Sequence, residues 1–590
     1  RIARRALEGY SGYEMVEDWK WQEKTNQWYL LCSLDIGLSE NPMVPAKTYW
    51  YIFAKDYPFG YLEFYPAKTN GLSRTYPHQH YNHPDETNVP WTFGNICLDA
   101  VTKKIGRVGG ADTEPYTAVD RLKWRVKKAL YWLKEASVNN LIAPNESYEI
   151  PDIPHSPADK GKIVFSENKN SFETWSNQDK DVGYFEYCRL KQKPELFLIH
   201  RFWLTRDNVI QISWGNVIEP ITKASSMGIW IKLNSAPILP PWHVPMYWGD
   251  MRRVFQIQGK NLDNYLQEKV HRLRGLETIL LVIGWPIPKQ LNQTSVQMHW
   301  FCIKMPCLSK SDNPANGFRP GVLGCWRRDR LECLSDDRMI KWLDTENWSA
   351  DQISSRGKLS TKICMDNILL IGGGALGSIL AELLVRAGVI NITILDREDL
   401  EIGNLSRHTL TLEDVGKKKA TTLATRLNKI TPHVKAIGID ESLSPEIYDR
   451  IKTANIILDC TGSDEALLQL HQLNWEAQKH FISLSFGYEL KRMYMFTAMG
   501  VVFPNESFQQ QIAPWLEHDR SEYGDADLPR EGVGCWSPIF PGRIDNIYTL
   551  AGIALKEIEK FVELETVTDT LIVYKQYDDG NGIKISRDSL

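Results

Sequence analysis

The sequence has no long apolar run and no strong excess of one charge. Its most apolar stretches, such as residues 279–288, are far shorter than the ~20 residues that cross a bilayer. With 69 Lys and Arg against 73 Asp and Glu, the 590 residues carry a formal net charge of −4. We therefore expect no membrane-spanning helix and no direct binding of nucleic acid.

Cysteine is scarce as well. The ten cysteines are spread along the chain, and no two of them form a Cys-x-x-Cys pair. This spacing excludes a disulfide scaffold and argues against a structural zinc site. The first residues, which include Arg4 and Arg5, contain no apolar signal-peptide core. We expect reduced thiols in a cytoplasmic protein, so each cysteine has to be judged by its own surroundings.

Three segments differ in pattern and predict an α/β multidomain protein. Residues 1–155 hold strand-like alternation followed by an amphipathic helix over 119–133, which predicts an α+β domain. Residues 156–355 are rich in Trp and carry no recognisable motif, so the fold of this mixed middle domain is left unassigned. In residues 356–590 strands alternate with helices, which predicts a Rossmann-like, mostly parallel, doubly wound sheet.

A glycine-rich motif follows the first apolar strand of the C-terminal segment. Gly372, Gly374 and Gly377 form a G-x-G-x-x-G pattern that opens a predicted helix. Such glycines let the backbone approach a ligand, and a helix N-terminus offers unpaired N–H groups and a partial positive charge. Asp396 ends the next predicted strand, where a carboxylate can bind a ribose. These features fit a nicotinamide dehydrogenase as well as an ATP site.

The polar residues that follow favour ATP. Asn404, Arg407 and Lys419 precede Asp459, which ends another predicted strand. Adenylyl transfer releases pyrophosphate, whose charge must be met by fixed cations and magnesium. We predict that Arg407 and Lys419 are these cations and that Asp459 binds the magnesium ion. Taken alone, Lys419 also fits a solvated face, and Asp459 also fits a turn at a strand end.

This ordered series resembles the ThiF/MoeB superfamily and the ubiquitin-activating enzymes over residues 356–565. Those enzymes adenylate the C-terminus of a ubiquitin-like protein, so the resemblance implies ATP and Mg as cofactors and a ThiF-type fold. In that family an arginine shortly before the glycine-rich strand reaches the nucleotide of the other subunit of a homodimer. Arg356 is the candidate for that role in this sequence.

Cys535 is the first candidate thiol. It lies in a loop between a charged, Gly- and Pro-containing stretch and a helix predicted over 545–562. An acyl adenylate acylates an accessible thiol, so we predict that Cys535 forms a thioester. The alternative is a buried loop cysteine. Cys460, beside Asp459 at a strand end, is predicted to be packed.

Cys97 is the second candidate thiol. The run Gly94-Asn95-Ile96-Cys97, with the preceding strands and the following helix, resembles a ubiquitin-conjugating enzyme over residues 19–137. The resemblance implies that Cys97 carries an acyl group which an amine attacks. The His-Pro-Asn that usually precedes such a cysteine is replaced by a histidine-rich loop. The alternatives for its oxyanion-stabilising role are Asn82, His78, His80 and His83.

The combination of both modules resembles the fused activating and conjugating enzymes of bacterial CBASS anti-phage operons. The resemblance implies a relay in which the C-terminus of a partner protein passes from ATP activation to Cys535, then to Cys97, and then to a target lysine. In that family the partner is a cyclic-oligonucleotide synthase. One alternative is a sulfur-carrier adenylyltransferase whose N-terminal domain only binds protein, and the other is a catalytically silent scaffold.

Overall fold

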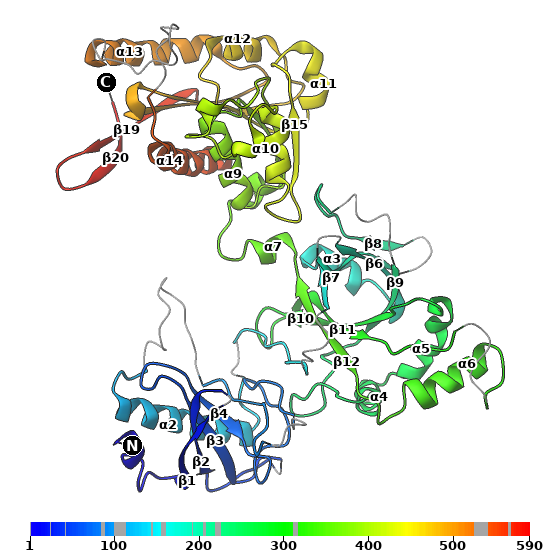
Figure 1. Cartoon of the computed structure of the whole chain (residues 1–590). Helices are drawn as coiled ribbons and strands as arrows, with labels where there is room; N and C mark the ends of the chain where they lie inside the picture. Colours follow the sequence, from blue (N-terminus) through cyan, green and yellow to red (C-terminus); the bar gives the residue numbers. More distant parts are fainter. Residues whose placement is uncertain are drawn as a thin grey trace. The chain divides into compact units, whose positions relative to one another are not determined.

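The computed structural model in Figure 1 divides into two compact units, residues 1–212 with 224–347 and residues 213–223 with 348–590. Among the helices that it describes, none combines the length and the apolar character needed to cross a bilayer. The predicted division at 155/156 and 355/356 stays a prediction. The described residues are 2–23, 25–41, 43–83, 89–98, 114–142, 146–154, 161–190, 193–204, 208–218, 226–310, 317–523, 541–564 and 568–589.

The N-terminal part is an antiparallel four-stranded sheet with one long helix. The strands pair in the order β1-β2-β3-β4, and apolar residues of α2 pack on the sheet as the 3.6-residue period predicts. The helix begins after Thr117, whose side chain accepts a hydrogen bond from the N–H of Asp120 at 3.1 Å. The elements are α1 (Ile2–Arg5), β1 (Tyr13–Gln22), β2 (Gln27–Asp35), β3 (Lys47–Ala54), β4 (Leu62–Pro66) and α2 (Ala118–Ser137).

The middle of the chain forms a sheet that closes on itself. The strand order is β5-β12-β11-β10-β9-β6-β7-β8, and β5 pairs with both β12 and β7, which removes the edges of the ring. The strands are β5 (Lys162–Phe165), β6 (Val182–Leu190), β7 (Lys193–Trp203), β8 (Val209–Gln211), β9 (Ser226–Lys232), β10 (Leu280–Pro288), β11 (Ser295–Lys304) and β12 (Lys341–Asn347). The helices are α3 (Lys169–Ser176), α4 (Trp248–Ile257), α5 (Leu262–Val270) and α6 (Val322–Arg328).

The C-terminal sheet is mixed. Strands β15-β14-β13-β16-β17 are parallel, as the alternation of strands and helices predicts, and β18-β19-β20 continue the sheet in antiparallel fashion. The strands are β13 (Asn367–Ile371), β14 (Asn391–Leu395), β15 (Lys435–Ile439), β16 (Ile456–Asp459), β17 (Lys479–Phe486), β18 (Arg492–Gly500), β19 (Thr570–Asp578) and β20 (Ile583–Arg587). The helices are α7 (Ala350–Ile353), α8 (Thr361–Met365), α9 (Ala375–Arg386), α10 (Lys419–Leu427), α11 (Tyr448–Ile451), α12 (Asp464–Gln472), α13 (Asn505–Tyr523) and α14 (Ile544–Glu563).

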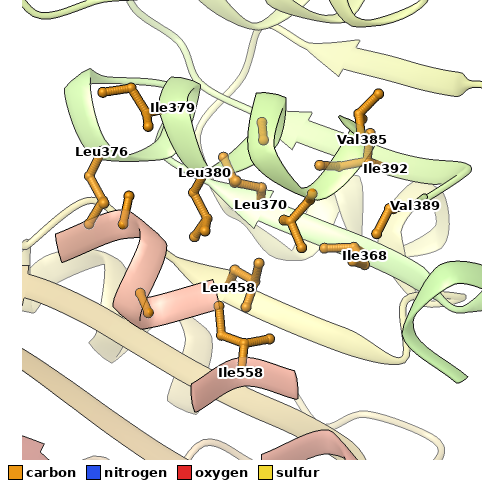
Figure 2. Close-up of a cluster of buried hydrophobic side chains, with 14 of the residues drawn as sticks. Ile368, Leu370, Leu376, Ile379, Leu380, Val385, Val389, Ile392, Leu458 and Ile558 are labelled. Atoms are coloured by element: carbon orange, nitrogen blue, oxygen red, sulfur yellow. The ribbon is translucent and has the colours of Figure 1, made fainter. Parts of the chain in front are cut away.

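Helices cover both faces of this sheet, which makes it doubly wound. Successive residues of β13 point to opposite sides, so Leu370 packs with α9, α10 and α14, while Leu369 packs with α11, α12 and α13. Figure 2 shows the first of these cores, in which Leu380 of α9 lies beside Leu370 of β13, and Ile558 contributes from α14. This packing fixes the start of α9 at the end of β13.

A short segment between β8 and β9 packs on the edge of this sheet. The N–H of Gly215 donates to Pro432 O at 2.7 Å, and the N–H of Asn216 donates to Val434 O at 3.1 Å. The indole of Trp214 stacks on His433 with ring centroids 5.2 Å apart. The segment therefore covers backbone groups that lead into the edge strand β15.

Candidate nucleotide and thiol sites

The turn from β13 into α9 requires glycine at two of the predicted positions. Gly372 has a φ of +88°, and a Cβ there would lie 2.9 Å from Thr461 Cγ2. A Cβ at Gly377 would lie 1.9 Å from the carbonyl oxygen of Gly372. A Cβ at Gly374 would meet no atom within 4 Å. Gly374 is therefore the point at which the turn faces open space, at the N-terminus of α9.

Asp396 organises this turn. Its Oδ2 accepts a hydrogen bond from the N–H of Gly373 at 2.7 Å, and its Oδ1 accepts one from the N–H of Glu398 at 2.8 Å. Burial raises the pKa of Asp396, and the two N–H groups and Lys419 act in the opposite direction. The carboxylate is thus held in a fixed orientation at the end of β14, where we predicted a ribose contact.

His408 is a site residue to which sequence reasoning assigned no role. Its Nδ1 accepts a hydrogen bond from the N–H of Leu410 at 3.0 Å, so the proton resides on Nε2, which donates to Gly373 O at 2.6 Å. Burial lowers the pKa of His408, which favours the neutral ring. Asp396 and His408 therefore hold the N–H and the carbonyl of the same glycine. The available signal was the position of this histidine directly after Arg407.

A cleft of about 350 Å³ lies at the carboxyl ends of β13, β14 and β16. The chain leaves β13 for β14 on one side and later enters β16 on the other, so the cleft occupies the point at which the strand order reverses. Three predicted residues line it, namely Gly372, Gly374 and Asp396. The polar lining residues that sequence reasoning missed are Arg397, Glu398, Glu441, Ser442, Thr461, Ser463, Glu465 and Gln469.

Lys419 is buried beside this cleft. Its residue is 5% exposed, and its Nζ lies 2.6 Å from Glu398 Oε2, a carboxylate that lines the cleft. The two preceding lysines are exposed and pair with surface carboxylates. This contrast excludes the solvated-face alternative for Lys419 and leaves its role as a phosphate-binding cation a prediction.

Asn404 and Arg407 lie on the loop that leads to His408. Asn404 Oδ1 accepts a hydrogen bond from the N–H of Glu401 at 3.0 Å, and the N–H of Arg407 donates to Asn404 O at 2.9 Å. The amide oxygen of Asn404 thus stabilises its own turn. Contacts of these two side chains with a nucleotide stay predictions.

Asp459 is 1% exposed at the end of β16. Its Oδ1 accepts hydrogen bonds from the N–H and the hydroxyl of Thr461, at 3.1 and 2.6 Å, and its Oδ2 accepts one from Ser483 at 2.8 Å. Burial raises its pKa. These three donors occupy three of the about four acceptor positions of the carboxylate. Within the described ranges no three His, Cys, Asp or Glu side chains cluster as a metal site, and Asp459 as the magnesium ligand stays a prediction.

The C-terminal segment contains the two thiols considered from the sequence, Cys460 and Cys535. Cys460 lines the cleft, but burial and the neighbouring Asp459 raise its pKa well above the usual range, so it stays a weakly nucleophilic thiol. Cys535 lies outside the described residues, and its predicted thioester role remains a prediction. The helix that we predicted after Cys535 is present as α14.

Arg356 is exposed and lies away from the glycine-rich turn of its own chain. The neighbouring Ser354 and Lys358 approach Gly388, just beyond the C-terminal end of α9. The turn is at the other end of this helix, about 18 Å away at 1.5 Å per residue. Arg356 is therefore unsuited to contact the nucleotide of its own chain, and its contact with a second subunit stays a prediction.

Cys97 is exposed and lies on a short antiparallel bridge with the histidine-rich loop. Gln79 pairs with Ile96, and the N–H of Cys97 donates to His78 O at 2.7 Å. Cys97 and His78 are thus opposite each other across the bridge. This geometry presents the candidate thiol at the surface next to a histidine.

Asn82 is removed from the alternatives for the oxyanion-stabilising group. It is 2% exposed, and its Nδ2 donates to Leu72 O at 2.7 Å and to Arg74 O at 3.0 Å. Its amide hydrogens are therefore used to hold the loop. His80 pairs with Asp152 at 3.3 Å, and His83 packs against Phe93 with ring centroids 5.5 Å apart. His78 is the histidine whose backbone contacts Cys97 directly.

Two family models match the chain, the Cap2 central linker domain over residues 139–348 and the ThiF family over residues 350–498. The ATP-dependent ubiquitin transferase-like protein Cap2 of Enterobacter hormaechei subsp. hoffmannii is 29% identical over 91% of this chain and 90% of that protein. The sulfur carrier protein ThiS adenylyltransferase of Bacillus subtilis is 40% identical over 17% of this chain and 31% of that protein. The structure of E. coli MccB with ATP has a TM-score of 0.28 and 14% identity, over 39% of this chain and 64% of that chain.

These matches confirm the resemblance stated from the sequence: the chain is a homologue of Cap2 with a ThiF domain in its C-terminal part. They also confirm the prediction of an enzyme of the activating and conjugating adenylyltransferase class, which sets aside the silent scaffold. The middle region, which we left unassigned, matches the Cap2 linker domain.

Proposed function

We propose that the chain uses ATP to adenylate the C-terminus of a partner protein, holds this C-terminus as a thioester on Cys535, passes it to Cys97 and joins it to a target amine. One observation carries the proposal. A chain that matches Cap2 over 91% of its length holds both a cleft at the switch point of a ThiF domain and an exposed cysteine in its N-terminal part.

The cleft suits a nucleotide. The open backbone at Gly374 and the start of α9 support a phosphate contact through backbone N–H groups. Asp396, whose carboxylate accepts the N–H of Gly373, is the residue that we propose binds a ribose hydroxyl. Lys419 supplies a buried positive charge, with Arg407 as the second proposed cation. The terminal carboxylate would displace pyrophosphate from ATP, and the Cys535 thiol would then displace AMP from the acyl adenylate. Magnesium at Asp459 would neutralise phosphate charge.

The thiol steps need no further cofactor. The Cys97 sulfur attacks the carbonyl carbon of the Cys535 thioester, a new C–S bond forms, and Cys535 leaves as a thiolate. An amine, which we propose is a target lysine, then attacks the acyl carbon on Cys97. An amide forms and the Cys97 thiolate is released. Exposure of Cys97 allows both reaction partners to approach.

We further propose that the partner is a cyclic-oligonucleotide synthase in a CBASS anti-phage system, because the chain resembles the fused enzymes of those operons. The ThiF parts would form a homodimer in which Arg356 of one subunit meets the nucleotide of the other. The reduced thiols that the relay requires fit the cytoplasm.

A second candidate function is a sulfur-carrier or ubiquitin-like adenylyltransferase whose N-terminal domain only binds protein. The 40% identity to a ThiS adenylyltransferase favours this second function, and the match covers 17% of the chain. In that case Cys97 takes no part in catalysis.

In the deciding experiment, the full chain is incubated with ATP, Mg²⁺ and a purified cyclic-oligonucleotide synthase whose gene neighbours the gene of this chain. Mass spectrometry then measures acyl groups on the peptides that contain Cys97 and Cys535. We expect Cys97→Ala to accumulate the Cys535 thioester and to lose the amide product, and Cys535→Ala to lose both adducts. Cys307→Ala removes an exposed thiol outside both proposed sites and should behave as wild type. Undiminished product formation by Cys97→Ala would favour the second candidate.

A further inference from the structure

The loop beside Cys97 is held by a segment that follows the N-terminal part. Residues 146–153 run along the end of β10, where the N–H of Tyr148 donates to Lys289 O at 3.1 Å and the N–H of Leu291 donates to Glu146 O at 2.9 Å. This segment lies within the range that matches the Cap2 linker domain. The surroundings of Cys97 are thus completed by residues outside the part that resembles a conjugating enzyme.

The side chain of Glu149, in this segment, contacts both the backbone N–H and the imidazole ring of His78. The N–H of His78 donates to the two carboxylate oxygens of Glu149, at 2.9 and 3.0 Å. The ring nitrogen Nδ1 lies 3.2 Å from Glu149 Oε2. One carboxylate therefore fixes the position of the backbone and the direction of the imidazole.

His78 in turn binds Cys97. Its carbonyl accepts the N–H of Cys97 at 2.7 Å, and its own φ of +57° lies in the left-handed region that non-glycine residues rarely adopt. Such a conformation persists only where its surroundings hold it, and Glu149 provides that restraint. A continuous chain of contacts runs from Glu149 through His78 to the backbone of the candidate thiol.

His78 and Glu149 are partly exposed to solvent, and further carboxylates lie close to them. The side chains of His78 and Glu149 are 40% and 25% exposed. Burial raises the pKa of Glu149, and the ring and N–H of His78 act against this rise. The other carboxylates that face the pair are Asp152 and Glu146, and Glu146 Oε2 lies 3.8 Å from His78 Nε2. Each ring nitrogen of His78 thus lies near a carboxylate of this segment, Nδ1 near Glu149 and Nε2 near Glu146.

We propose that His78 is the general base for the amine that attacks the acyl group on Cys97, and that Glu149 is its positioning residue. The inference rests on the proposed function. The amine nitrogen forms a bond to the acyl carbon, the C–S bond breaks with its electron pair on Cys97 Sγ, and the amine proton passes to His78 Nε2. Transfer of that proton to the thiolate restores both groups.

The test loads Cys97 without ATP and without Cys535. A glycine-terminated peptide carrying a mercaptoethanesulfonate thioester is exchanged onto the full chain with Cys535→Ala, and mass spectrometry follows its loss from the Cys97 peptide when L-lysine is added between pH 5.5 and 9. We expect His78→Gln to slow discharge at pH 7 by about 100-fold and to remove the inflection of the pH profile. We expect Glu149→Gln to slow discharge less than His78→Gln does, and Glu149→Asp to recover part of the rate, because a carboxylate at this position orients the ring of His78.

His271→Gln is the control, since this histidine is exposed and lies outside the loop beside Cys97. It should keep the wild-type rate and profile. Discharge by His78→Gln at the wild-type rate, or a slowing of equal size at every pH with the profile preserved, would overturn the proposal. If His78→Gln does not fold, the rate of Glu149→Gln decides, and discharge by this variant at the wild-type rate counts against the proposal. Failure of ATP-dependent loading in the wild type would contradict the proposed function and leave this measurement intact.

Discussion

Glu398 Oε2 lies 2.6 Å from Lys419 Nζ, and this ion pair joins a buried cation to an exposed carboxylate of the nucleotide cleft. The side chain of Lys419 is 6% exposed, whereas that of Glu398 is 66% exposed. A phosphate that enters the cleft would compete with Glu398 for the ammonium group. The carboxylate therefore orients the ammonium group and is a partner that a phosphate could replace.

The first prediction is that Lys419 and Glu398 affect the affinity for MgATP in opposite directions. Lys419→Gln should weaken binding of MgATP by at least about tenfold, because the cation is lost, while Glu398→Gln should strengthen binding, because the competitor is lost. Isothermal titration with MgATP measures both. Lys417→Gln is the control, since Lys417 pairs with Asp414 at the surface and should leave the affinity unchanged. Equal affinities for Lys419→Gln and the control would show that Lys419 does not bind phosphate.

The second prediction compares two glycines of one turn. Gly377→Ala places a methyl group 1.9 Å from a backbone oxygen, so it should lower the free energy of unfolding by about 1–3 kcal/mol or more. Gly374→Ala meets open space and should unfold like the wild type, but its methyl group should obstruct the nucleotide and weaken MgATP binding. Thermal unfolding and titration calorimetry provide the two readouts. A Gly374→Ala protein with wild-type affinity would exclude close approach of the ligand at this position.

The third prediction concerns the buried Glu167 of the middle sheet. Burial raises its pKa to about 7, above the usual 4.5, although the hydroxyl of Ser171 and the indoles of Trp300 and Trp175 donate to it. The folded state thus retains a proton that the unfolded state releases, so stability is greatest below pH 4.5 and falls as the pH rises to about 7. The loss amounts to about 3 kcal/mol.

Glu167→Gln removes this titration. The melting temperature of the variant relative to wild type should therefore rise between pH 5 and pH 8, as measured by scanning calorimetry. Glu173→Gln, on an exposed position of α3, is the control and should show a constant difference. A constant difference for Glu167→Gln as well would mean that Glu167 is ionised in the folded protein.

The sequence predicts the C-terminal architecture well because parallel strands buried on both faces must be continuously apolar. The run from Ile368 to Ile371 is such a strand, and the glycines that follow predict the turn into α9. The antiparallel strands β18–β20 carry no comparable motif. Closure of the middle sheet was also beyond prediction, since the pairing of β5 with β12 and β7 joins distant residues without a local signal.

Some site residues can likewise be predicted from the sequence, and others cannot. Gly372 and Asp396 follow from motif spacing, because both lie at strand ends that converge on one edge of the sheet. Glu149 does not follow from motif spacing, because its contact with His78 depends on how the segment after α2 folds back onto the histidine-rich loop. The histidine-rich loop indicated the type of residue near Cys97, and only the tertiary structure distinguishes the buried Asn82 from the accessible His78.

The fourth prediction concerns Arg492, which anchors α13. This arginine is 2% exposed, and its guanidinium group contacts Asp519, Glu522 and Asp588. Burial alone would lower the pKa of Arg492, but hydrogen bonds with Asp588 and Glu522 raise it, so the group is charged in the folded protein. Removal of the cation leaves several carboxylates close together without a counter-charge.

Arg492→Met should therefore lower the free energy of unfolding by about 3–5 kcal/mol, the cost of breaking a buried ion pair from one side. Arg587→Met is the control, because its side chain is 58% exposed and should cost less than about 1 kcal/mol. Urea unfolding of both variants gives the comparison. Similar stabilities for the two variants would show that the carboxylates are held by other groups.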